Sequence, residues 1–112
     1  MITNELRNYL AQQLKTQLNN AKVGLGGNST SPAQNDLDVP SLATATIITS
    51  DSDDNVIEAK ISVAGSELTN SVIREMGIFD SNSKLMNRIN FEGVGPFASN
   101  ETLEIFLLIE VE

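Results

Sequence analysis

Apolar residues at the start of the chain recur every four positions, with polar residues between them. The stripe consists of Ile2, Leu6, Leu10, Leu14 and Leu18. This spacing predicts an amphipathic helix over residues 3–20, with Thr3 or Asn4 as its N-cap. Because a step of four residues overshoots one helical turn, the stripe drifts around the helix. The helix could cover its own domain or form a seam against other copies of the chain.

From residue 42 onward the hydrophobic pattern has a period of two, which indicates β-strands. Residues 42–50 are rich in β-branched side chains, and residues 56–64 alternate between apolar and polar ones. The polar stretch 51–55 between them predicts a turn. Residues 21–41 begin like a short strand and continue as a loop rich in Gly, Ser, Asn and Pro. The chain therefore changes from a helix to strands within its first third.

Residues 72–91 predict a hairpin around which the rest of the chain is arranged. A tight turn at Ser81-Asn82 would pair Phe79 with Lys84 and Glu75 with Arg88. Because side chains alternate across a strand, this register predicts one apolar face. That face consists of Val72, Met76, Ile78, Leu85, Ile89 and Phe91. The residues that we expect to have a structural role in the hairpin are Glu75, Gly77, Phe79 and Arg88.

The final predicted strand, residues 103–111, is apolar on both faces near its middle. Ile105, Leu107 and Ile109 share one face, and Phe106 and Leu108 lie on the other. This composition implies either a central strand or burial at a subunit interface. Together the patterns predict one domain over residues 1–112. Its fold is mainly β, an antiparallel β-sandwich of about five to seven strands preceded by one N-terminal amphipathic α-helix.

Composition and charge narrow the classes of partner. The 112 residues are 40% hydrophobic, which is typical of an ordered domain. The net charge is −8 and the basic residues are scattered, so we expect no nucleic-acid binding. The apolar run Ile105–Ile109 is far shorter than the roughly 20 residues of a membrane helix. The start of the chain has no basic region followed by an apolar stretch, so we expect no signal peptide.

The residue inventory removes most catalytic and metal chemistry. The chain has no Cys and no His, so thiolate nucleophiles, disulfides and the commonest general base are excluded. Asp51, Asp53 and Asn55 match the first ligand positions of a calcium loop. Val56 and Ser62, however, stand where that loop needs its Gly and its bidentate Glu. A solvated turn is the better interpretation, and we expect no metal site.

Two further motifs resemble sites without completing them. Gly24-Leu25-Gly26-Gly27-Asn28-Ser29 is similar to a phosphate-binding loop but lacks its Gly-Lys-Ser/Thr ending. A flexible loop or a close backbone approach explains these glycines better. Glu75 lies opposite Arg88 in the expected hairpin, which would keep its carboxylate ionised rather than make it an acid. We therefore expect no enzymatic activity, no cofactor and no small-molecule substrate.

Several segments, in consistent order behind an N-terminal helix, resemble a known family. They are Val23-Gly24-x-Gly26 with the loop to Asp36-Leu37, the hairpin Ile73-Arg74-Glu75-Met76-Gly77-Ile78-Phe79-Asp80 with the strand from Lys84 to Phe91, and the closing Leu103-Glu104-Ile105-Phe106-Leu107-Leu108-Ile109. They are similar to the N-terminal, baseplate-attachment domains of bacteriophage tail-collar fibre and tail-fibre proteins. The segment between Pro32 and Leu42 departs from that family, because it lacks the acidic-then-Arg step.

The resemblance implies a structural virion protein of a tailed bacteriophage. Proteins of that family continue into a fibre shaft or tip, whereas this chain ends at Glu112. We therefore expect only the attachment module, made in the host cytoplasm and located in the tail or baseplate. It would dock or connect tail fibres through protein–protein contacts. The alternatives are another virion position (neck, tail tube or capsid decoration) or a ligand-binding β-sandwich module, although exposed aromatic residues for such a site are scarce.

The helix stripe and the doubly apolar last strand also predict self-association. Fibre-like assemblies are commonly homotrimers, so we expect a trimer that binds other tail, baseplate or fibre proteins. The residues expected at these interfaces are Leu6, Leu10, Leu14, Leu18, Phe106 and Leu108.

Overall fold

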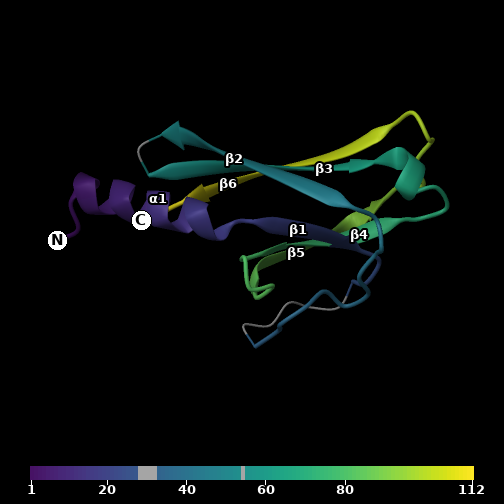
Figure 1. Cartoon of the computed structure of the whole chain (residues 1–112), viewed down its shortest axis with the longest axis horizontal. Helices are drawn as coiled ribbons and strands as arrows, with labels where there is room; N and C mark the ends of the chain where they lie inside the picture. Colours follow the sequence, from purple (N-terminus) through teal and green to yellow (C-terminus); the bar gives the residue numbers. More distant parts are fainter. Residues whose placement is uncertain (28–32, 54) are drawn as a thin grey trace.

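The computed structural model describes residues 1–27, 33–53 and 55–112, which form one α-helix and two small antiparallel sheets (Figure 1). The elements in chain order are α1 (Asn4–Gln17), β1 (Asn20–Gly24), β2 (Ala45–Asp53), β3 (Val56–Ala64), a short 3-10 helix (Gly65–Glu67), β4 (Ile73–Phe79), β5 (Leu85–Val94) and β6 (Thr102–Glu110). The prediction of a mainly β, sandwich-like fold behind one helix is confirmed.

Each sheet contains three strands, in the orders β1-β4-β5 and β2-β3-β6. The two sheets form the layers of the sandwich, and α1 leads directly into β1 at one end (Figure 1). β4 and β3 are the central strands, while β6 lies at an edge of its sheet. The interpretation of the last strand as a central one is therefore wrong. Burial at a subunit interface, the other explanation for its two apolar faces, stays a prediction.

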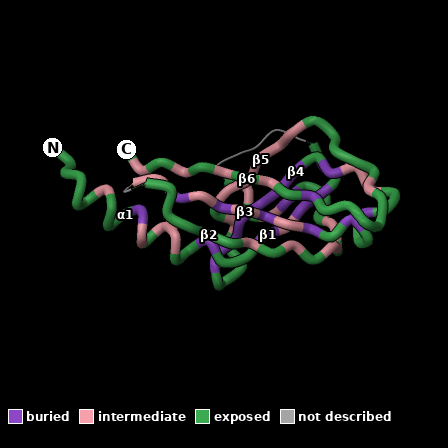
Figure 2. The backbone as a smooth tube through the Cα atoms, turned by 90° about the horizontal axis from the view of Figure 1, so that it is seen from above, coloured by how far each residue is buried: buried purple, intermediate pink, exposed green. Residues whose placement is uncertain are grey.

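The core lies between the layers and is built from the inward-facing positions of the central strands. Ile57, Ala59, Ile61 and Val63 of β3 are buried, as their alternation predicted. Figure 2 shows the buried segments concentrated where β3, β4 and β1 overlap. Apart from Leu103 of β6, which is buried, the apolar residues that the edge strands β2, β5 and β6 contribute to the core are only partly buried. Water therefore has no access to the centre of the sandwich, but it does reach apolar side chains along these edge strands.

The helix is shorter than predicted and only its second half packs on the sandwich. Thr3 caps it, because its side-chain oxygen accepts a hydrogen bond from the Leu6 amide at 3.2 Å. The helix ends at Gln17, because Leu18 turns into the core and β1 begins at Asn20. Leu14 packs against the same core. Leu14 and Leu18, expected at an interface between chains, are therefore used within this one.

The hairpin forms between β4 and β5, but its predicted register is wrong. Glu75 pairs with Asn90, Gly77 with Arg88, and Phe79 with Leu85. The register shifts twice, between Ile73 and Glu75 and between Ile78 and Phe79. A shift of one residue turns the following side chains to the opposite face. A pattern of alternating residues cannot place such shifts.

The turn of the hairpin explains where one shift begins. The Asp80 carboxylate accepts hydrogen bonds from the amides of Asn82 and Lys84, both at 2.9 Å. The Asp80 amide also donates to the Lys84 carbonyl at 3.0 Å, which closes a loop over residues 81–83. Ser83 adopts a left-handed conformation with φ of 61°. The turn is therefore one residue longer than the predicted Ser81-Asn82.

The composition of the two hairpin faces was predicted in part. Met76, Ile78, Ile89 and Phe91 face the core as expected. Leu85 instead lies on the other face, since its Cδ1 atom is 3.1 Å from where a Gly77 side chain would begin. Val72 lies in the same way beside Gly93 and outside the core. Both exceptions follow from the register shifts.

The acidic stretch 51–55 is also less of a turn than predicted. β2 continues to Asp53, which pairs with Val56, and the register of β2 against β3 shifts between Asp51 and Asp53. Asp54 lies outside the described residues. The β3 bounds match the predicted 56–64, and β6 begins one residue earlier than predicted.

Candidate functional site

A buried carboxylate organises the face of the β1-β4-β5 sheet that points away from the core. Glu75 of β4 is completely buried, and Arg88 of β5 has only 3% of its side chain exposed. The Arg88 Nε and Nη2 atoms lie 3.0 and 2.9 Å from Glu75 Oε1. Because Gly77 is the residue directly opposite Arg88, the ion pair is diagonal. The expected pair therefore exists without the expected register.

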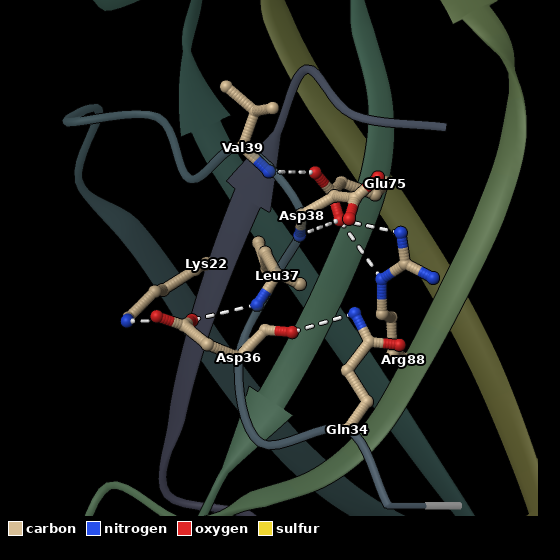
Figure 3. Close-up of polar contacts among 8 residues, drawn as sticks. All are labelled: Lys22, Gln34, Asp36, Leu37, Asp38, Val39, Glu75 and Arg88. Carbon is tan, nitrogen blue, oxygen red and sulfur yellow. Dashed lines mark hydrogen bonds and ion pairs between the residues drawn. The ribbon is translucent and has the colours of Figure 1, made fainter. Parts of the chain in front are cut away.

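The same carboxylate binds the loop that follows β1. The amide of Gly26 donates to Glu75 Oε2 at 2.8 Å. The Val39 amide donates to the same oxygen at 2.9 Å, and the Asp38 amide donates to Oε1 at 2.8 Å (Figure 3). One side chain thus holds both ends of the loop against the sheet. The loop ends are also joined directly, by Leu25–Val39 and Ser41–Val23 backbone hydrogen bonds of 2.8 and 2.9 Å.

Two glycines allow the carboxylate to approach this closely. A Cβ atom on Gly24 would lie 2.7 Å from Glu75 Oε2 and from the Val39 carbonyl oxygen. A Cβ atom on Gly26 would lie 2.3 Å from the Asp38 Cβ atom. Neither distance is sterically possible. The Gly-x-Gly motif is therefore explained by close backbone approach, as expected, and Asn28 and Ser29 lie outside the described residues.

The charge state of Glu75 follows from its partners. Burial alone would raise the pKa of the Glu75 carboxyl, because a charge is poorly solvated inside a protein. The three backbone amides and Arg88 outweigh this effect and hold the pKa below its ordinary value of 4.5. Glu75 is therefore an ionised structural acceptor, not a proton donor.

Beside the carboxylate, the loop packs its one buried leucine against the sheet. Leu37 is 5% exposed, and its Cδ2 atom lies 2.8 Å from where a Gly77 side chain would begin. Asp36 shapes this turn, since its carboxylate accepts from the Leu37 amide at 2.8 Å and from Lys22 Nζ at 3.3 Å (Figure 3). We call Gly24, Gly26, Leu37, Glu75, Gly77 and Arg88 the Glu75 cluster.

The Glu75 cluster was only partly visible in the sequence. Glu75, Gly77 and Arg88 were identified as structural residues, and Phe79 is buried beside them. The roles of Asp38 and Val39 were missed, because they act through backbone amides that any residue carries. Two short motifs in the sequence could have indicated this cluster. They are the Gly-x-Gly from Gly24 to Gly26, at the end of one strand, and the Glu-x-Gly from Glu75 to Gly77 in another.

Two of the apolar surfaces that are exposed among the described residues contain residues expected at interfaces. The first is the helix stripe, defined as Ile2, Leu6, Tyr9 and Leu10, which are 40–60% exposed. Ile2 precedes α1, and Leu6, Tyr9 and Leu10 lie in the N-terminal half of the helix. The start of α1 extends past the ends of the strands (Figure 1). The second is on the outer face of the β2-β3-β6 sheet, where Phe106 and Leu108 are 59% and 64% exposed.

The acidic stretch anchors the helix through Asp51. Asp51 Oδ1 accepts from Gln12 Nε2 at 2.8 Å and from Lys15 Nζ at 3.2 Å. These hydrogen bonds, with Gln12 the larger contributor, lower the pKa of the Asp51 carboxyl from its ordinary value of 3.8. Within the described residues, no group of three metal-binding side chains is assembled.

A polar hollow of about 460 Å³ lies beside this anchor, between the first turns of α1 and the ends of β2 and β6. Its lining residues are Asn4, Arg7, Asp53, Asn55, Glu110 and Glu112. The lining contains no apolar side chain to bind the body of an organic ligand, so the hollow does not resemble a small-molecule site.

Comparisons with known proteins do not assign this chain to a family. No family model matches the chain, and searches of curated proteins and of solved structures found no significant match. Among the described helices, none is long and apolar enough to span a membrane.

Proposed function

We propose that this chain is a structural virion protein of a tailed bacteriophage. In this proposal it is a tail or baseplate component that docks or connects tail fibres through protein–protein contacts. It performs no catalysis and binds no cofactor. Its place is the assembled particle, after synthesis in the host cytoplasm.

One observation carries the proposal: segments that resemble tail-fibre attachment domains meet in the Glu75 cluster. Gly24 and Gly26 come from the first segment, Leu37 from the loop that follows it, and Glu75, Gly77 and Arg88 from the hairpin. Residues that are far apart in sequence therefore depend on one another for packing and hydrogen bonding. The resemblance then concerns a connected structural unit rather than separate short motifs, and this supports the same use as an attachment domain.

The exposed helix stripe supports self-association, and we propose a trimer because fibre-like assemblies are commonly homotrimers. Leu6 and Leu10 are 43% and 40% exposed although they are apolar, and Tyr9 beside them is 60% exposed. The helix carries Glu5, Arg7 and Lys15, so it is nearly neutral in a chain of net charge −8. Copies can therefore meet along the helix with less repulsion than elsewhere. In this arrangement Leu6 and Leu10 form the seam.

Localisation in the particle tests the proposed function. Purified particles of the virus that encodes the chain should contain it by mass spectrometry, and gold-labelled antibodies should bind at the tail end. Particles made without the chain should lack attached fibres. Label on the head, or absence of the chain from the particle, would contradict the proposal.

Light scattering tests the trimer separately. The unmodified chain should have three times the monomer mass, and the double variant Leu6→Ser, Leu10→Ser should be a monomer with unchanged stability. Met86→Ser is the control, because Met86 is equally exposed (43%) on the distant strand β5 and should leave the trimer intact. A monomeric unmodified chain at high concentration would disprove the trimer.

A further inference from the structure

β6 is an edge strand that lacks the usual protection of an edge. It pairs with β3 on one side, and no described strand pairs with its other side. Natural edge strands are usually short, or carry a charge or a proline near their centre. β6 has nine residues, and its centre, Ile105–Ile109, is apolar without interruption. The unpaired backbone of β6 is therefore available to another strand.

The side chains of β6 are also incompletely covered. On the inner face, Ile105, Leu107 and Ile109 contact the core but remain partly exposed. On the outer face, Phe106 and Leu108 are mostly exposed. Figure 2 shows β5 and β6 along the same side of the sandwich, and apart from Leu103 the core residues of both strands are only partly buried. A strand added beside β6 would cover apolar side chains of both faces.

The charges at the two ends of this apolar centre indicate which strand would fit. Glu104 and Glu110 flank the centre on the outer face of β6, and Glu58 lies opposite Leu108 on β3. Two cations lie nearby, since Lys60 Nζ is 3.8 Å from Glu104 Oε1 and Arg7 lines a hollow together with Glu110 and Glu112. The four carboxylates Glu58, Glu104, Glu110 and Glu112 still outnumber these two cations. Opposite charges that face each other across two paired strands stabilise the pairing, and like charges weaken the pairing. The edge is therefore complementary to a strand with basic ends.

We propose that β6 is a docking edge for an extended segment of another protein. This segment has an apolar, β-branched centre flanked by Lys or Arg, and it extends the β2-β3-β6 sheet by one strand. Because both ends of the β6 centre are acidic, either strand direction satisfies the charges. A second copy of this chain fits less well, because its own β6 and its net charge of −8 are acidic. The inference does not depend on the viral assignment.

A synthetic peptide tests the edge directly. The probe has alternating valine and threonine, as long as Ile105–Ile109, between two lysines that match Glu104 and Glu110 in spacing. Fluorescence anisotropy should detect binding that weakens as salt is added. An otherwise identical peptide with glutamate in place of lysine should bind about tenfold more weakly. The double variant Glu104→Lys, Glu110→Lys should reverse this preference.

A matched pair of variants locates the bound peptide. Leu108 and Ile48 are each 64% exposed on the outer face of the same sheet, but on opposite edge strands. Leu108→Ser should weaken peptide binding, and Ile48→Ser should leave it unchanged. Equal effects of the two variants, equal binding of the two peptides, or no binding at all would overturn the proposal. So would a dimer of the unmodified chain that Leu108→Ser dissociates, since the occupant would then be a second copy.

The helix stripe and β6 share no residue. The test of peptide binding and the test of trimer formation can therefore give opposite results. Peptide binding is also independent of where the chain lies in a particle.

Discussion

Two carboxylates hold two different parts of this protein in place, and they differ in their access to water. Glu75 is fully buried and binds three loop amides and Arg88. Asp51 has 52% of its side chain exposed and binds Gln12 and Lys15 of the helix. Breaking a buried ion pair leaves a charge that water cannot reach, whereas water replaces the partners of an exposed carboxylate. The Glu75 cluster therefore stabilises the whole fold, and the Asp51 contact only positions the helix.

Removal of the buried charge is expected to have the largest effect. Glu75→Gln should lower the free energy of unfolding by about 3–5 kcal/mol, because Arg88 and the loop amides lose their anionic acceptor. Urea denaturation measures this change. Glu104→Gln is the control: its exposed carboxylate lies 3.8 Å from Lys60, and its loss should cost at most about 1 kcal/mol. Similar losses for the two variants would show that burial of Glu75 is unimportant.

A methyl group added next to Glu75 is expected to have the next largest effect. Gly26→Ala should cost about 1–3 kcal/mol, since the new Cβ atom would collide with Asp38 and Glu75. Gly27→Ala is the matched control in the same loop, because the nearest atom there, Arg74 Cδ, is 3.9 Å away. Melting temperatures of the two variants make the comparison. If both melt alike, the close approach of the loop does not matter.

Acid is expected to weaken the Glu75 cluster in a defined pH range. The pKa of Glu75 is lower in the folded chain than its ordinary value of 4.5. The stability it contributes is therefore fully present above pH 4.5, and is lost as the pH falls through the folded pKa. Urea midpoints should decrease once the pH is lowered below 4.5. They should decrease less steeply in Glu75→Gln than in the unmodified chain. The same slope in both proteins would assign the acid sensitivity to other carboxylates.

Removal of the exposed carboxylate charge is expected to have the smallest effect, and a local one. Asp51→Asn weakens the hydrogen bonds to Gln12 and Lys15 but leaves the core untouched. Amide hydrogen exchange should accelerate in α1, while exchange in β3 and β4 stays unchanged. Faster exchange throughout the sheets would mean that the two carboxylates have equal structural weight.

Local patterns were sufficient for the elements of this fold but not for their pairing. The alternation of Ile57, Ala59, Ile61 and Val63 identified β3 and its buried face correctly. Thr3 was correctly recognised as a possible helix cap. The hairpin register was wrong, because the extra residue at Met86 and the three-residue turn after Asp80 change the pairing without changing the apolar pattern.

The candidate surfaces show the same division. The two apolar faces of residues 103–111 were evident from composition, but their explanation was not. Whether such a strand is central or at an edge depends on which strands pair with it, and the structure places β6 at the edge. Likewise, the apolar series predicted for the helix, which runs from Ile2 to Leu18 in steps of four, contains Leu18, which is 5% exposed, and Leu10, which is 40% exposed. Periodicity identifies an apolar stripe, and packing decides which part of it is covered.

The sequence by itself determined a helix followed by antiparallel strands, because side-chain periodicity and capping residues act over a few neighbouring positions. It also excluded chemistry that depends on Cys or His. Only the tertiary structure decided that Gly26, Val39 and Arg88 meet at Glu75. Backbone amides carry no sequence signature, and a contact over 49 residues depends on the path of the whole chain. The exposed edge of β6 was decided in the same way.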